Sequence, residues 1–216
     1  MSIAKRSVNF ISSVLKVYGP SKLKKLLWDR EFAGNKWNFM DDTSADCVYA
    51  TLEKYAHGGD ILDLGCGPGN TANELDAGIY RKYIGIDISA AALAKAEKRT
   101  KDTGRTEKNS FAVSDFLGYK PAQHFEIILF RESLYHVPYG QVKEILDKYS
   151  QFLTTTGAFV VRLYATDIST GEIKSRVTHK LDLLNREFDV VEWNEYETPG
   201  KPTVVVFRPR NPSPVA

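Results

Sequence analysis

The sequence predicts an α/β protein with a doubly wound, seven-stranded and mostly parallel sheet whose last strand is antiparallel. Three observations support this. Short apolar segments alternate with amphipathic helical segments over residues 60–207, the order that builds a parallel sheet covered by helices on both faces. A glycine-rich turn directly follows the first apolar segment. The last two apolar segments are joined by a connection too short for a crossover helix, so we expect them to pair antiparallel.

Each element has its own sequence signal. The first strand, which begins with ILDL at residue 61, runs into the glycine turn, and YIGIDIS at 83–89 forms the second strand. Ser89 is placed to cap the alanine-rich helix that follows it. The remaining elements are predicted from apolar residues that lie at helical spacing or in short runs typical of strands. They are a short helix at 71–76, strands at 109–116 and 125–133, a helix at 141–153, a strand at 157–165, a helix at 173–184, and strands at 188–196 and 203–209.

Composition limits the classes of partner. The 216 residues carry 29 Lys and Arg against 27 Asp and Glu, a formal net charge of +2, which is not the signature of a nucleic-acid or membrane-surface protein. Cys47 and Cys66 have neither metal-ligand spacing nor the density of a disulfide framework, so we expect a reducing, cytoplasmic location and no metal. No apolar run approaches the roughly 20 residues of a membrane-spanning helix.

The turn DLGCGPG, residues 63–69, carries the first functional signal. Its glycines let a ligand approach the backbone, and Asp87, about 20 residues downstream at the end of the next strand, is placed to bind both hydroxyls of a ribose. The glycine spacing differs from the G-x-G-x-x-G of dinucleotide sites, and Pro68 removes an amide that a phosphate would use. Asp63 precedes the glycines and suits a cationic ligand. These features favour a sulfonium nucleoside.

DLGCGPG, IGIDIS and VSDF together resemble the class I S-adenosylmethionine-dependent methyltransferases, which have a Rossmann-like fold. The resemblance implies S-adenosyl-L-methionine as cofactor and S-adenosyl-L-homocysteine as product. It implies that Gly65 and Gly67 line the methionine part of the cofactor, that Asp87 holds the ribose and that Ile88 packs on the adenine. The other predicted cofactor-binding residues are Asp63, Cys66, Asp115, Phe116, Arg131 and Trp37.

Two of these carboxylates have alternative interpretations. Asp115, with the amide of Phe116, is implied to read the edge of the adenine, but an acid at this position also suits a helix cap. Asp63 either contacts the cofactor or accepts hydrogen bonds from the amides of its own loop.

The segment RESLYH follows the fourth strand and supplies the candidates for catalysis, Arg131, Glu132, Tyr135 and His136. Glu132 is placed to hold a substrate ammonium, Tyr135 to wall the pocket and His136 to take a proton. Alternatively, Glu132 pairs with Arg131 or Arg162, and His136 only begins the next helix. The E-x-L-Y pattern resembles small-metabolite N-methyltransferases, including the nodulation-factor type. The Asn/Asp-Pro-Pro-aromatic sequence of enzymes that methylate base amines is absent.

The chain divides into three predicted parts: an N-terminal helical extension that also serves as an active-site lid (1–56), a methyltransferase domain (57–210) and a tail (211–216). The lid prediction rests on residues 28–42, which resemble a segment that closes over the cofactor in related enzymes. Its aromatic residues are Trp28, Phe32, Trp37 and Phe39.

We therefore expect an S-adenosylmethionine-dependent methyltransferase that acts on a small metabolite, at nitrogen rather than oxygen. One alternative is methylation of RNA or of a protein side chain, with the basic N-terminal residues docking the larger substrate. The other is a module that binds the cofactor without catalysis.

Overall fold

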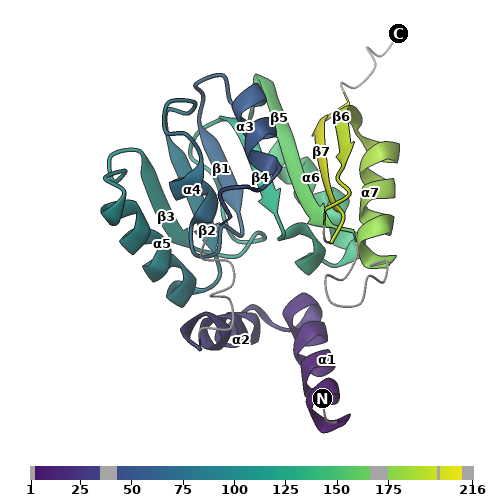
Figure 1. Ribbon diagram of the computed structural model, residues 1–216. Coiled ribbons are helices and arrows are strands. Elements are labelled where there is room, and N and C mark those ends of the chain that lie inside the picture. Colours follow the sequence, from purple (N-terminus) through teal and green to yellow (C-terminus); the bar gives the residue numbers. More distant parts are fainter. Residues whose placement is uncertain (1–2, 35–42, 166–174, 199, 211–216) are drawn as a thin grey trace.

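A seven-stranded sheet is the centre of the computed structural model, which describes residues 3–34, 43–165, 175–198 and 200–210 (Figure 1). The strand order is β3-β2-β1-β4-β5-β7-β6. Neighbouring strands from β3 to β5 are parallel, and β7 is antiparallel to both β5 and β6, so the predicted fold class is confirmed. The strands are β1 (Ile61–Leu64), β2 (Tyr83–Asp87), β3 (Asn109–Val113), β4 (Phe125–Arg131), β5 (Leu153–Tyr164), β6 (Asp189–Glu195) and β7 (Pro202–Arg208).

Helices cover both faces of this sheet. Side chains of α3 and α4 pack into one apolar cluster with β1, β4 and β5, and those of α6 and α7 pack into a second cluster on the other face. The helices of the sheet region are α3 (Val48–Tyr55), α4 (Asn70–Glu74), α5 (Ala90–Asp102), the 3₁₀ turn η2 (Leu134–His136), α6 (Tyr139–Ser150) and α7 (Ser175–Glu187). In the described part of the chain, no helix has the length and apolar character needed to cross a membrane.

The sequence patterns that predicted the elements act as expected. Residues 125–130 of β4 are all buried, which is why this strand, apart from Glu126, reads as an apolar run rather than as an alternation. Ser89 caps α5, because its hydroxyl accepts a hydrogen bond of 3.1 Å from the Ala92 amide.

The strands β2, β3 and β4 each end two or three residues earlier than predicted, and the ends of β3 and β4 form part of the site. β4 stops at Arg131 because Glu132 has a φ of 54°, which an extended strand does not allow. β3 stops at Val113, and its continuation, Ser114, donates its amide to the Asp87 carbonyl at 3.0 Å before the chain turns away.

The N-terminal helices α1 (Ile3–Tyr18) and α2 (Ser21–Ala33) lie beside the carboxyl ends of the strands (Figure 1). Three hydrogen bonds hold α2 there. The Ser21 hydroxyl donates to Asp115 at 2.6 Å, and Asp29 accepts from the Ser89 hydroxyl at 2.8 Å and from the Ala91 amide at 3.2 Å. Trp37 and Phe39 of the predicted lid, and the predicted tail at 211–216, lie outside the described residues.

Close packing between β2 and the glycine loop predicts that Gly85→Ala destabilises the protein. A Cβ at this position would lie 2.7 Å from the Cys66 sulfur and 2.8 Å from the Phe111 ring, so the substitution overpacks the core. We expect the free energy of unfolding in urea to fall by about 1–3 kcal/mol. Gly140→Ala is the matched control, because no heavy atom lies within 4 Å of the Cβ it would add. Equal stabilities of the two variants would contradict this packing.

Candidate active site

A cavity of about 850 Å³ opens at the carboxyl ends of the parallel strands. It is bounded by the loops after β1, β2, β3 and β4, by the end of β5, and by α1, α2 and residues 43–47. All the predicted site residues that the structure describes line this one cavity: Asp63, Gly65, Cys66, Gly67, Asp87, Ile88, Asp115, Phe116, Arg131, Glu132, Tyr135 and His136. The remaining prediction, Trp37, lies outside the described residues.

The glycine loop brings backbone, rather than side chains, to the wall of the cavity. Gly65 has a φ of 87°, and a Cβ there would lie 2.6 Å from the Cβ of Ser133. The amides of Gly65 and Cys66 both donate to the Ile86 carbonyl, at 2.8 and 3.0 Å, so the loop is fixed to β2. Only glycine suits position 65, for conformational and for steric reasons.

Asp87 lies at the end of β2 with its carboxylate against this loop. It accepts hydrogen bonds from the amides of Gly67 at 3.0 Å and Ser89 at 2.8 Å. Burial raises the pKa of Asp87 to about 6, because these backbone amides only partly replace the lost water. A buried carboxylate held by amides at a cavity wall still has lone pairs to accept hydrogen bonds from ligand hydroxyls.

Asp63 is the more deeply buried of the two acids and is 1% exposed. It accepts a short hydrogen bond from the Tyr83 hydroxyl, and its Oδ1 atom has no hydrogen-bond partner among the described residues. Burial raises the pKa of Asp63 to about 7. The hydrogen bond to Asp63 comes from Tyr83 on β2 and not from the amides of the glycine loop. A cationic ligand group would compensate for the burial of the Asp63 carboxylate.

Asp115 and Phe116 form the wall after β3. Burial raises the pKa of Asp115, but hydrogen bonds from Ser21 and from the amides of Gly118 and Leu117 lower it by more, so the net shift is downward. The Gly118 amide donates at 2.8 Å, which makes Asp115 a turn cap, related to its alternative interpretation as a helix cap. Its contact with adenine stays a prediction.

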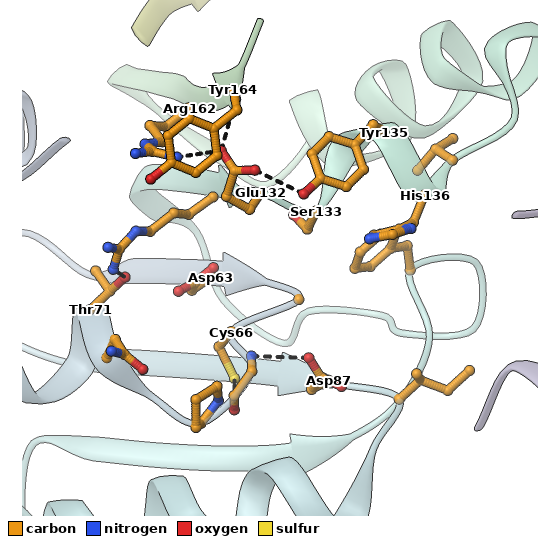
Figure 2. Close-up of a pocket in the computed structure, with 18 of the residues that line it drawn as sticks. Asp63, Cys66, Thr71, Asp87, Glu132, Ser133, Tyr135, His136, Arg162 and Tyr164 are labelled. Atoms are coloured by element: carbon orange, nitrogen blue, oxygen red, sulfur yellow. Dashed lines mark hydrogen bonds and ion pairs between the residues drawn. The ribbon is translucent and has the colours of Figure 1, made fainter. Parts of the chain in front are cut away.

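On the opposite side of the cavity, Glu132 is held by three hydrogen-bond donors (Figure 2). Arg162 forms a short ion pair with its Oε1 atom, the Tyr164 amide donates to the same atom at 2.9 Å, and the Tyr135 hydroxyl donates to Oε2 at 2.8 Å. The pairing with Arg162 is therefore present. The side chain remains 16% exposed and lines the cavity, so a further contact with substrate stays a prediction.

The Arg162–Glu132 pair is one end of a row of four charged side chains. Asp46 accepts from Arg162 at 3.0 Å and from Arg131 at 2.9 Å, and we call Arg131, Asp46, Arg162 and Glu132 the ion row. Burial raises the pKa of Asp46, but the two guanidinium groups lower it by more. Arg131 also donates to the hydroxyls of Tyr49 at 2.9 Å and Thr71 at 3.2 Å. Its role in holding cofactor or substrate stays a prediction.

His136 lies in η2 between two aromatic rings, with centroid distances of 4.6 Å to Tyr135 and 4.8 Å to Trp28. Burial and the nearby Lys16 and Lys180 ammonium groups lower the pKa of His136 to about 3. The imidazole is therefore neutral at physiological pH and is a weak base. Trp28 and Phe32 of α2 line the same cavity, as the lid prediction requires of them.

Sequence reasoning missed several members of this site. Asp46, Thr71, Ser133 and Tyr164 all line the cavity, and Arg162 was considered only as a partner of Glu132. Arg162 had a usable signal, because it interrupts the buried apolar run FVVRLY. Asp46 had none, because only the tertiary structure places it beside Arg131.

The chain is similar to known methyltransferases in sequence and in fold. Residues 61–157 match a family model described as a methyltransferase domain. The chain is 40% identical over 52 residues to the mRNA cap guanine-N(7) methyltransferase of Candida glabrata, which is 24% of this chain and 12% of that protein. It is 30% identical over 89 residues to the ubiquinone biosynthesis O-methyltransferase of Paraburkholderia phytofirmans, 40% of this chain and 38% of that protein. The matched segments thus cover well under half of either relative.

Among solved structures, the N-methyltransferase NodS from Bradyrhizobium japonicum WM9 in complex with S-adenosyl-L-homocysteine superimposes with a TM-score of 0.64. The superposition covers 87% of this chain and 98% of that one, at 20% identity. Residues 61–157 thus match a methyltransferase domain, and the fold is that of a solved methyltransferase, in agreement with the resemblance carried by DLGCGPG, IGIDIS and VSDF.

The ion row predicts a large stability loss when its central anion is removed. The Asp46 side chain is 7% exposed. Asp46→Ala would leave the two buried guanidinium groups of the ion row with a single carboxylate, that of Glu132, to balance their charge. We expect the free energy of unfolding in urea to fall by about 3–5 kcal/mol. Asp102→Ala is the control, since Asp102 pairs only with the exposed Lys98 and its loss leaves stability almost unchanged. A small effect of Asp46→Ala would show that the ion row does not hold these segments together.

Proposed function

We propose that this chain transfers the methyl group of S-adenosyl-L-methionine to a nitrogen atom of a small molecule. The observation that carries the proposal is that one cavity joins two sets of residues. The glycine loop, Asp87 and Asp115 form one end, and the polar segment Arg131–His136 forms the other. A donor and an acceptor bound at these two ends would meet inside a single enclosed volume.

The cofactor end fits the cofactor chemically. S-adenosyl-L-methionine combines a ribose with a cationic sulfonium and ammonium, and this end combines the buried carboxylates of Asp87 and Asp63 with open backbone at Gly65 and Gly67. Asp87 would accept the ribose hydroxyls, and the Oδ1 atom of Asp63 would gain the hydrogen bond that it lacks in the described structure. The complex of NodS with S-adenosyl-L-homocysteine is a precedent in the same fold.

The cavity size supports a small acceptor. Sites for small ligands span roughly 300–1,000 Å³, and this cavity, at about 850 Å³, lies within that range. The relatives include an O-methyltransferase and an N-methyltransferase, so the comparisons favour neither atom. The preference for nitrogen rests on Glu132, an anion that would stabilise the positive charge that a nitrogen atom gains when it is methylated.

The cofactor, when bound, supplies an activated methyl group, and the residues of the chain provide binding, orientation and exclusion of water. Glu132 would hold an N–H of the acceptor, and its own position is fixed by Arg162 and the Tyr164 amide. Trp28 and Phe32 of α2 form part of the cavity wall and keep water from the reacting groups.

The predicted role of Asp87 gives a direct test with purified protein. We expect Asp87→Ala to weaken S-adenosyl-L-homocysteine binding by about 1–3 kcal/mol, because a buried charged acceptor of hydrogen bonds is lost. Isothermal titration calorimetry measures this, with Asp102→Ala, which lies far from the cavity lining, as the control. Unchanged affinity in Asp87→Ala would exclude the ribose assignment. Cofactor binding without product from amines, phenols or RNA would favour the non-catalytic module.

Cofactor affinity should rise with pH. Burial raises the pKa of Asp87 to about 6 and that of Asp63 to about 7, and both must ionise to hold hydroxyl and ammonium groups. Below these pKa values, binding must expel protons, so affinity increases from about pH 5 to pH 8 and then levels off. Calorimetry in buffers of different ionisation enthalpy counts the released protons. In Asp87→Asn, the change in cofactor affinity near pH 6 should vanish. A wild-type cofactor affinity that does not depend on pH would contradict the proposed roles of both Asp87 and Asp63.

A further inference from the structure

The acceptor end of the cavity, defined here by Trp28, Glu132, Tyr135, His136 and Tyr164, has a chemistry that narrows the class of acceptor. Any methyl acceptor must present a lone pair. A protonated amine needs a base to free its lone pair, and an alcohol needs one to become a strong enough nucleophile, whereas a weakly basic nitrogen needs none. The described residues of this end show which of these cases the site suits.

Glu132 is arranged to accept hydrogen bonds and not to take up a proton. Both of its oxygens already accept hydrogen bonds, from Arg162 and the Tyr164 amide on Oε1 and from the Tyr135 hydroxyl on Oε2. Its carboxylate is the partner of the buried Arg162, which is 3% exposed. The remaining lone-pair capacity of Oε2 suits one N–H of a substrate.

His136 does not supply a base either. Its ring lies between the rings of Tyr135 and Trp28, and burial keeps its pKa low, at about 3. The charged groups that act on it come from several elements: Lys16 of α1, Lys24 and Glu31 of α2, and Lys180 of α7. The cations outnumber the single anion and oppose protonation of the imidazole.

An anionic acceptor is also disfavoured. The two guanidinium groups of the ion row are matched by the two carboxylates of Asp46 and Glu132, and Lys16 pairs with Glu31 at 2.5 Å. A carboxylate or phenolate beside Oε2 would therefore meet the like charge of Glu132, while the guanidinium groups next to it are already paired. By contrast, a nitrogen that becomes cationic on methylation meets a carboxylate and the faces of aromatic rings, both of which stabilise a cation.

We propose that the acceptor is a weakly basic nitrogen that is already unprotonated at neutral pH. It is either an aromatic amine held through its own N–H by Glu132, or an azole whose other ring nitrogen donates its N–H to Glu132. This rests on the proposed function. The nitrogen lone pair forms the new N–C bond, and the electron pair of the breaking C–S bond stays on sulfur. The cationic product then loses an N–H proton to water, from the methylated nitrogen of the amine or from the other ring nitrogen of the azole. No protein base takes part before the transfer.

A panel of one-ring compounds tests this with the full-length protein and S-adenosyl-L-methionine. Aniline and pyrazole represent the proposed class, benzylamine a strongly basic amine, phenol a hydroxyl and benzoate an anion. We expect aniline or pyrazole to give the highest kcat/KM at pH 7, measured by mass spectrometry of the methylated product. Benzylamine should react only in proportion to its unprotonated fraction as the pH rises.

Binding gives a second readout that does not depend on turnover. Aniline should bind the protein loaded with S-adenosyl-L-homocysteine, and Glu132→Gln should weaken this binding or lower kcat/KM by about 10- to 100-fold. Asp147→Asn is the matched control, because Asp147 forms an exposed pair with Lys143 and does not line the cavity. Cofactor affinity should be the same in both variants, which shows that each is folded.

Three outcomes separate the two proposals. Turnover of phenol or benzoate that is faster than that of aniline would overturn the acceptor class together with the preference for nitrogen. Benzylamine turnover that exceeds that of aniline at pH 7, or that follows an enzyme group instead of its own ionisation, would overturn the acceptor class alone. Absence of cofactor binding would overturn the proposed function itself.

Discussion

Four ionised side chains in contact, Arg131, Asp46, Arg162 and Glu132, hold the two halves of the cavity wall in place. They come from the end of β4, the end of β5 and the segment before α3, which are far apart in the sequence. Burying such a row costs solvation energy that hydrophobic residues of the same volume would not require, so stability alone does not explain it. Its evident effect is positional, because it fixes the carboxylate of Glu132 in a backbone conformation with a φ of 54°.

The cavity has two ends of different construction. At the cofactor end the wall is largely backbone, and its two buried acids, Asp63 and Asp87, have raised pKa values because few charged groups compensate for their burial. At the acceptor end the wall consists of side chains that satisfy one another, and Glu132 contacts Arg162 and Tyr135. The first arrangement suits a ligand that brings its own hydroxyls and positive charge. The second suits a ligand that needs one well-oriented hydrogen-bond acceptor.

The sequence predicted the fold, and it predicted which residues of the glycine loop and of the strand ends line the cavity, because both depend on local signals. Apolar runs of strand length, a capping Ser89 and the glycines of residues 63–69 each impose a backbone geometry on their neighbours, and parallel strands then bring their carboxyl ends to one edge. The acceptor end is different. Asp46 meets Arg131 only because α3 packs on the sheet, and no pattern near residue 46 encodes that contact. The left-handed conformation of Glu132, which ends β4 early, is likewise imposed by tertiary contacts and not by its residue type.

The close approach of Gly65 to Ser133 links these two ends. A side chain at position 65 would collide with Ser133, so the loops after β1 and β4 are in close contact at these two residues. This contact sets the spacing between the glycine loop and the segment after β4, independently of the aromatic residues around it. Under the proposed function, replacement of Tyr135 or Tyr164 during evolution would change which molecule is accepted while the distance over which the methyl group is transferred stays the same. Position 65 is expected to stay glycine, because its φ of 87° disfavours any side chain whatever residue occupies position 133.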